Sequence, residues 1–460
     1  MQSSCEYPTW TVAALADKIE QRKIYLPKFQ RGVSWNEERQ KKLIGSIRQG
    51  FPIGALLLSK SNTEVPGNET YSLIDGLQRT TAILKYLRNQ TSFIGSSDSD
   101  FLPEWRDFGK WVVGELLGQE FTDTQIDDLL HGYISSTEIE NIDRLEFYNL
   151  LIGLYPETEL GFLNGSQELK AKFESFKRSL KKSLDISGVS IPVIVFDGDE
   201  SLLPEIFERL NSQGIPLNKY QIFAATWHEK CKIDNAEIME SIKNFYVDRM
   251  RDTTLVIDDV DEDGMPDSLT LFDYLTGFGS ILCKRFPVLF DSTWSDYIAF
   301  QIATVAHQLP IGGMRKLPTR FSRDETNQIL TDRFTSAVIS TCQEVSSALE
   351  GRLSLKLNSA AQAEFSGHTA FQINTMITRI LIEKFDPSSW EVKSQTSTVY
   401  PSAQMIRRWY LIDRIKDAWG NAGDSQFFRQ VWALDGSDSY QPVKETLTGN
   451  TIEDLSLIHI

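Results

Sequence analysis

A strand, a tight turn and a helix follow one another without a linker in residues 71–81, and this order strongly constrains the fold of the chain. An apolar run at residues 73–74 meets a turn formed by Asp75 and Gly76, and an amphipathic segment comes next. The pattern predicts a buried strand that leads directly into a helix. Because the first turn of a helix presents unpaired N–H groups and the positive end of its dipole, this turn suits an anion.

The residues of this turn have side chains suited to phosphate chemistry. Arg79 offers a bidentate guanidinium and Gln78 a neutral donor, whereas Asp75 offers a carboxylate for Mg²⁺ or an attacking water. We therefore predict a site for a nucleotide or a nucleic-acid phosphate, with Asp75 and Arg79 as catalytic residues and Gly76 and Gln78 as cofactor-binding residues. An Asp-Gly turn followed by arginine also occurs by chance in many proteins.

Length and composition set the outer limits. With 460 residues, 41% of them hydrophobic and 11% aromatic, the chain can bury a sizeable core, and we expect two or three domains. No apolar run approaches the ~20 residues that cross a bilayer, and the first residues lack the pattern of a signal peptide. The four cysteines lie far apart without metal-ligand spacing. We expect reduced thiols in a cytoplasmic protein that does not bind a membrane.

The net charge of −16 and the pI near 4.9 disfavour loose binding to nucleic acid through overall electrostatics. Two local clusters of basic residues could still form a basic groove. A simpler explanation is that each is a solvated face that balances nearby acidic residues. The first cluster lies on a predicted helix and the second around a glycine loop, with the members Lys170, Lys172, Lys177, Arg178, Lys181 and Lys182, and Arg315, Lys316, Arg320 and Arg323.

The segment before the turn holds a second polar pair, Gln30 and Arg31. Pro27 keeps its predecessor extended, so residues 24–35 are predicted as strand or loop. Asn36 is predicted to cap a helix over residues 37–49, which leads to a buried strand at 55–58. Gln30 and Arg31 can face the same pocket as Gln78 and Arg79, or they can simply cap a loop.

The remaining pattern separates a mixed part from a helical part. Residues 191–196 are predicted as a strand that returns to the first sheet, and residues 202–210 as a helix that ends near Asn211. From about residue 234 to 441 the pattern is mainly helical. We therefore predict an α+β protein with a mixed sheet in its first half and a helical domain in its second.

Four sequence blocks, in the order LPKFQRGVSW, GFPIG, IDGLQRT and FERLNSQGIPLNKYQI, resemble the N-terminal domain of GmrSD-type restriction proteins. That domain belongs to the ParB/sulfiredoxin-like superfamily. The resemblance implies a ParB-like nucleotide-binding domain over residues 1–230, with a helical insertion at about 97–188, and a helical domain over residues 231–450.

The resemblance also implies a role in anti-phage defence, in which binding or hydrolysis of NTP with Mg²⁺ gates the cleavage of modified phage DNA. The family signature is Asp-Gly-Gln-Gln-Arg, and Leu77 replaces its first glutamine here. The resemblance carries Gln30 and Arg31 over as pocket members. It places Asn211 at the rim of the pocket, where a helix-end role explains this residue equally well. A homo-oligomer fits the same picture.

The end of the chain, residues 455–460, looks like the His-Ile-x-Pro start of a nuclease domain found in larger relatives. The same six residues are encoded by the adapter of a transposase-based sequencing library, so we expect a truncated frame with a non-native tail. A nuclease domain would then be lost from this chain or be supplied by a partner. The other histidines have no metal-ligand spacing, and we expect each to be a structural residue: His131, His228, His307 and His368.

An acidic segment at residues 259–267 matches the first half of a calcium loop, with Asp259, Asp261 and Asp263 at alternate positions before a glycine. Thr270 stands where a bidentate glutamate closes such loops, so an acidic loop between helices explains the segment more simply.

Two functions follow from these patterns. The first is a nucleotide-dependent DNA-defence protein that gates action on DNA. The alternative is a non-enzymatic DNA-binding regulatory or scaffold protein that uses the same pocket for a DNA phosphate. Both require that Arg31 and Arg79 converge on one anion.

Overall fold

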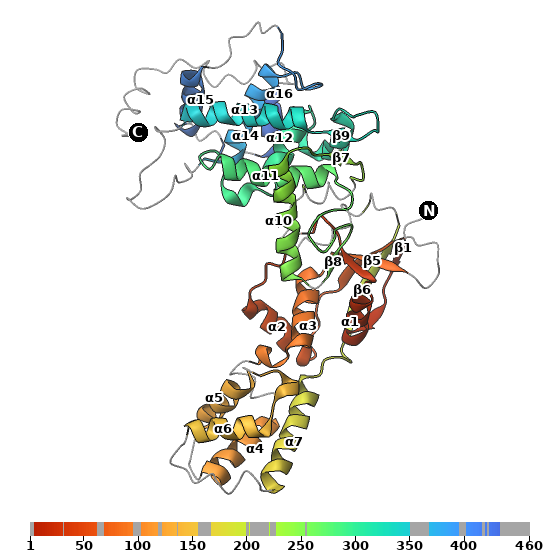
Figure 1. Cartoon of the computed structure of the whole chain (residues 1–460), viewed down its shortest axis with the longest axis vertical. Helices are drawn as coiled ribbons and strands as arrows, with labels where there is room; N and C mark the ends of the chain where they lie inside the picture. Colours follow the sequence, from red (N-terminus) through yellow and green to blue (C-terminus); the bar gives the residue numbers. More distant parts are fainter. Residues whose placement is uncertain are drawn as a thin grey trace, which may run out of the picture. The chain divides into compact units, whose positions relative to one another are not determined.

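The chain forms two compact units, one built on a mixed sheet and one of helices (Figure 1). The first contains residues 1–26, 32–199 and 252–256, and the second contains residues 27–31, 200–251 and 257–460. The computed structural model describes residues 4–30, 32–61, 69–94, 103–117, 122–135, 137–154, 167–198, 202, 220, 227–253, 255–349, 368–394, 402–415, 419–420 and 423–432. Within these ranges, no helix is both long and apolar enough to cross a bilayer.

A mixed sheet forms the centre of the first unit. Strand β4 pairs in parallel with β6 and antiparallel with β5, which in turn pairs in parallel with β3. The apolar residues at positions 56–58 of β4 are at most 2% exposed, as expected for a strand between two others. The strands follow one another in the order β1 (Ser4–Glu6), β6 (Ser190–Asp197), β4 (Leu56–Ser61), β5 (Thr70–Asp75), β3 (Ile24–Leu26) and β8 (Val256–Ile257), with β2 (Thr9–Thr11) also paired to β6. The predicted return of residues 191–196 to the first sheet is confirmed.

Helices α1 (Val12–Glu20), α2 (Glu37–Arg48) and α3 (Leu77–Arg88) belong to the same unit, and α2 packs against α3. The side-chain oxygen of Asn36 accepts a hydrogen bond from the backbone N–H of Arg39 at 3.0 Å, which confirms the predicted cap of α2.

A helical insertion with a core of its own separates α3 from β6. Stacked rings of Phe108 and Phe176, with centroids 4.4 Å apart, lie at its centre, and Phe147 and Phe173 pack beside them. Every third or fourth residue of the last helix faces this core. Its elements are α4 (Pro103–Trp111), a π-helical stretch (Val112–Leu117), α5 (Asp123–Ile134), α6 (Arg144–Leu154) and α7 (Gln167–Leu184).

The second unit is mainly helical, as the sequence predicts from residue 234 on, and the α+β class is confirmed. All nine residues of α12 are buried, and α14 packs against α12, α13 and α16. A two-stranded sheet of β7 (Cys231–Lys232) and β9 (Ile329–Leu330) joins two of its loops. Its longer elements are α10 (Ala236–Asp252), α11 (Leu271–Arg285), α12 (Ile298–Ala306), η8 (Ile311–Arg320), α13 (Asp332–Leu349), α14 (Ala370–Lys384), α15 (Ala403–Ile415) and α16 (Asp424–Trp432). The predicted domain limits stay predictions, and residues 455–460 lie outside the described ranges.

Two histidines are buried in this helical core and hydrogen-bonded as neutral rings. His307 Nδ1 donates to the carbonyl of Ala303 at 2.8 Å, while its Nε2 accepts from the indole N–H of Trp390 at 3.2 Å. His368 Nε2 lies 2.8 Å from the carbonyl of Leu289, and its Nδ1 lies 3.1 Å from the hydroxyl of Tyr410. Burial disfavours the imidazolium and lowers the pKa of each ring to about 4.

These histidines should make the second unit sensitive to mild acid. Between pH 6.5 and 4 the two histidines bind protons in the unfolded chain but stay neutral in the folded protein. The unfolding free energy is therefore highest above pH 6.5 and falls as the pH drops toward 4. The loss should reach roughly 3 kcal/mol per histidine. Urea unfolding at several pH values tests this, with His307→Gln as the comparison. Equal pH dependence in His307→Gln and the wild type would contradict the prediction.

Candidate functional site

A glycine with a left-handed backbone conformation, Gly76, joins β5 to α3 at the predicted site. Gly76 has φ +107°, and a Cβ at this position would collide with the side chain of Leu56. Gly76 is also the residue that caps α3, and it supplies no side-chain hydrogen bond to the first turn. The backbone N–H groups of that turn therefore have no capping side chain at this residue.

Asp75 and Arg79 form an ion pair across this turn. Arg79 Nη2 lies 2.7 Å from Asp75 Oδ2, and the two side chains are 18% and 38% exposed. A Cβ on Gly54 would collide with Arg79 Nη1, so the guanidinium lies directly against the bare backbone of that glycine. The block GFPIG thus ends beside the block IDGLQRT. We refer to Gly54, Asp75, Gly76, Gln78 and Arg79 as the α3 site.

The amide of Gln78 holds the segment that follows Arg31. Its Oε1 accepts hydrogen bonds from the backbone N–H groups of Ser34 and Trp35, both at 3.0 Å. Its Nε2 donates to the carbonyl of Gly32 at 3.2 Å. Gln78 thus fixes residues 32–35 beside the first turn of α3, a positioning contact that the sequence did not predict.

Two hydroxyls near the α3 site are buried without a hydrogen-bond partner. Thr80 and Thr81 follow Arg79 in α3 and are at most 2% exposed, and their Oγ1 atoms have no partner among the described atoms. Orphaned polar atoms of this kind are costly, and they cluster where a ligand or water completes the network.

The structure does not test the roles predicted for the other residues of the pocket. Arg31 and Asn211 lie outside the described residues, so the convergence of Arg31 with Arg79 stays a prediction. Gln30 belongs to the second unit, where it is 4% exposed and its backbone N–H donates to the carbonyl of Pro27 at 3.0 Å. Its predicted role in cofactor binding also stays a prediction.

Lys28, in the first sequence block, makes contacts that the sequence did not predict. Its Nζ lies 2.5 Å from Asp259 Oδ2, 2.9 Å from the carbonyl of Ser268 and 3.7 Å from Asp273 Oδ2. Arg249, itself 6% exposed, donates from Nη1 to the carbonyl of Lys28 at 2.7 Å. The partners lie more than 200 residues away in the sequence, and no local pattern signals them. Lys28 is therefore a structural anchor within the second unit.

The acidic segment at 259–267 folds as a tight loop closed by an antiparallel bridge between Val260 and Pro266. Asp261 Oδ1 accepts hydrogen bonds from the backbone N–H groups of Asp263 and Met265, at 3.0 and 2.7 Å. Asp259 is engaged by Lys28. Among the described residues, no group of three or more His, Cys, Asp or Glu side chains is placed to hold a metal. Calcium binding here stays a prediction.

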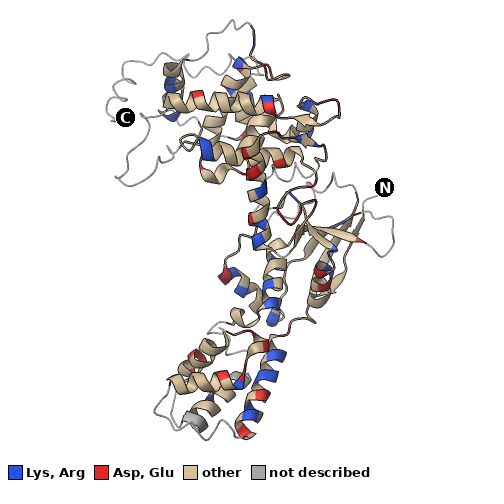
Figure 2. Cartoon of the chain, in the orientation of Figure 1, with Lys and Arg blue, Asp and Glu red and all other residues tan. Residues whose placement is uncertain are grey.

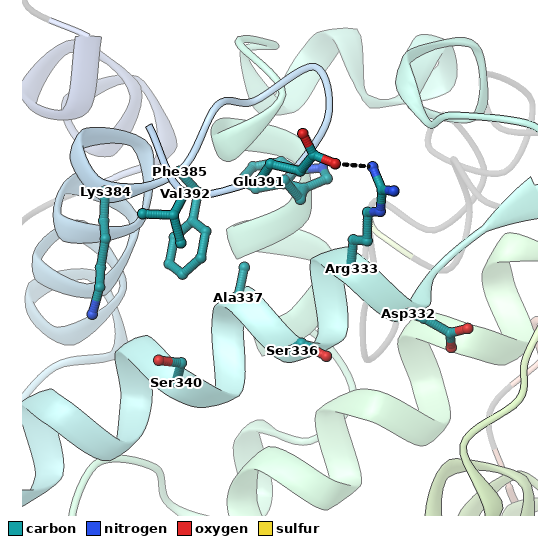
Figure 3. A pocket seen from close by; sticks show the side chains of 10 residues that line it. Asp332, Arg333, Ser336, Ala337, Ser340, Lys384, Phe385, Glu391 and Val392 are labelled. Atoms are coloured by element: carbon teal, nitrogen blue, oxygen red, sulfur yellow. Dashed lines mark ion pairs between the residues drawn. The ribbon is translucent and has the colours of Figure 1, made fainter. Parts of the chain in front are cut away.

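A cavity of about 460 Å³ lies on the second unit, between α13 and the loop after α14 (Figure 3). Figure 3 shows Arg333 and Glu391 paired at its edge, with their charged atoms 2.8 Å apart. Phe385, Val392 and Ala337 form its apolar side. None of the site residues predicted from the sequence lines this cavity.

Comparison with known proteins agrees with the resemblance given by the four blocks. Residues 12–228 match the family described as the GmrSD restriction endonuclease, N-terminal domain, which confirms that resemblance for this part of the chain. The chain is also 23% identical over 276 residues to an uncharacterized protein of Methanocaldococcus jannaschii, a match that covers 52% of this chain and 46% of the relative. The chain thus spans about half of the length of the curated relative it matches.

Replacing Gly76 should disrupt the start of α3. The Gly76→Ala substitution places a Cβ at positive φ and against Leu56, so we expect a loss of about 1–3 kcal/mol in unfolding free energy. Urea unfolding monitored by far-UV circular dichroism measures this. Gly45→Ala is the matched control, because Gly45 lies within α2 and a Cβ there meets nothing within 4 Å. The control should be neutral or stabilising by up to about 1 kcal/mol, and an equal loss in both variants would refute the role of Gly76.

Proposed function

Residues 12–228 belong to the GmrSD restriction endonuclease N-terminal domain family, and on this premise we propose that the protein is a nucleotide-dependent, restriction-type DNA-defence protein. In this proposal the sheet unit is a ParB-like domain that binds and hydrolyses an NTP with Mg²⁺ at the α3 site. Nucleotide binding then gates action on modified phage DNA, carried out by a nuclease domain or partner.

The geometry of Arg79 is the observation that carries the nucleotide site. Among the described residues, Asp75 pairs with Nη2 of the Arg79 guanidinium, while Nη1 lies against the backbone of Gly54. Arginine has five donors in a planar fork, so a phosphate oxygen can bind at Nη1 while Asp75 holds the fork in orientation. At 18% exposure, the side chain is partly desolvated, which strengthens a charge-assisted hydrogen bond.

The surrounding residues fit a phosphate and its metal. The first turn of α3, whose cap residue Gly76 supplies no side-chain hydrogen bond, can donate backbone N–H groups to the phosphate. The absent Cβ of Gly54 lets the guanidinium of Arg79 lie close to this turn. Asp75, 38% exposed, would hold Mg²⁺ through its second carboxylate oxygen or orient an attacking water. Bound Mg²⁺ would neutralise charge on the phosphates.

The same ion pair supports a second candidate function. A carboxylate that is paired with a guanidinium at 2.7 Å is a weaker metal ligand than a free one, because Arg79 already balances part of its charge. The α3 site would then hold a DNA phosphate without turnover, in a regulatory or scaffold protein. An assay of phosphate release from NTPs, with and without duplex DNA, separates the two functions. DNA binding without release favours the scaffold.

Arg79→Ala should weaken nucleotide binding. Loss of a charge-assisted contact to phosphate costs about 2 kcal/mol or more, which corresponds to roughly a 30-fold increase in Kd. Isothermal titration of ATP and GTP with Mg²⁺ measures the change. Arg88→Ala is the matched control, because this exposed arginine ends the same helix. Equal affinity in wild type and Arg79→Ala would remove Arg79 from the site.

A further inference from the structure

One helix of the first unit presents unpaired positive charge in a protein of net charge −16. Figure 2 shows Lys and Arg on successive turns of α7. Its opposite face is fixed in the core of the helical insertion, where five apolar residues are at most 3% exposed: Leu169, Phe173, Phe176, Leu180 and Leu184. Because these residues repeat at helical spacing, the orientation of the charged side of α7 is rigidly set.

The structure separates the cations of α7 into two groups. Lys177 donates from Nζ to the carbonyls of Ile142 and Glu140, at 2.5 and 3.2 Å, and Lys181 pairs with the carboxylate of Glu140 at 2.7 Å. These two cations serve the fold of the insertion. In contrast, Lys170, Lys172, Arg178 and Lys182 are exposed and form no ion pair with any described residue. The interpretation of this cluster as a solvated face that balances nearby acidic residues therefore explains only the first group.

Three of these four cations, Lys170, Arg178 and Lys182, lie on one flank of the helix. They are separated by eight and four positions, so they span about 18 Å of the axis within a sector of about 120°. We call Lys170, Arg178 and Lys182 the basic flank of α7. The helix has 18 residues and is about 27 Å long, which matches about eight base pairs of duplex DNA.

We infer that the basic flank of α7 binds the phosphate backbone of duplex DNA, an inference that rests on the proposed DNA-defence function. An acidic protein repels DNA at long range, so only local clusters of positive charge can contact it. Contacts from Lys and Arg to the phosphate backbone do not depend on the base sequence. Glu174 lies on the same flank, four positions from both Lys170 and Arg178, and opposes the binding of phosphate.

Fluorescence anisotropy with a labelled duplex of about 25 base pairs, long enough to extend past the ends of α7, tests this inference in the full chain at several salt concentrations. The variant Lys170→Gln/Arg178→Gln/Lys182→Gln should bind at least ~30-fold more weakly in 0.1 M salt, and the slope of log K against log salt should fall by about 2.7. Glu174→Gln should tighten binding several-fold. The swap Lys170→Arg/Arg178→Lys/Lys182→Arg should retain the wild-type slope, which separates loss of charge from loss of fold.

The matched control is Lys41→Gln/Lys230→Gln/Lys284→Gln, which removes the same charge from three exposed lysines outside both basic clusters. A slope that falls equally in this control, or that stays unchanged in the α7 variant, overturns the inference and leaves the nucleotide site standing. Tighter α7-dependent binding to duplex RNA overturns the assignment to DNA. A wild type that binds no duplex, although it binds NTP at the α3 site, overturns both this inference and the DNA part of the proposed function.

Discussion

The left-handed conformation of Gly76 is the constraint on which the first unit depends. It turns the chain from β5 into α3 within one residue, and the absent Cβ lets the turn approach Leu56 of the neighbouring strand. This sharp turn brings Asp75, the last residue of the strand, within an ion pair of Arg79 in the first turn of the helix. A larger residue would displace the helix start, and with it every side chain that the α3 site requires.

The sequence predicted this local geometry because its determinants are local. An apolar run before Asp-Gly, a polar pair and helical periodicity together define a strand, a turn and a helix start, and Asn36 defines a second helix start in the same way. The strand at 191–196 was also predictable, because a short β-branched run flanked by polar residues is typical of a buried strand. The family signature added the order of the blocks.

The roles of individual polar side chains were not predictable, since their partners are distant in sequence. Gln78 was predicted to bind the cofactor, which stays a prediction, and its amide also binds backbone groups more than 40 residues away. Lys28 binds Asp259, 231 residues further on. Alternating carboxylates suit calcium, yet Asp261 uses its carboxylate to accept backbone N–H groups of its own loop. A polar residue type restricts the possible partners, and only the fold selects among them.

The same distinction governs the positive charges. Lys28, Lys177 and Lys181 each satisfy carbonyl or carboxylate oxygens within the protein, so their charge stabilises the fold and is partly neutralised. Arg79 is intermediate, because Asp75 pairs with one of its terminal nitrogens while the other lies against the backbone of Gly54. In an acidic protein, anion binding therefore depends on the few cations that the fold leaves unpaired, and their positions in the fold carry more information than their number in the sequence.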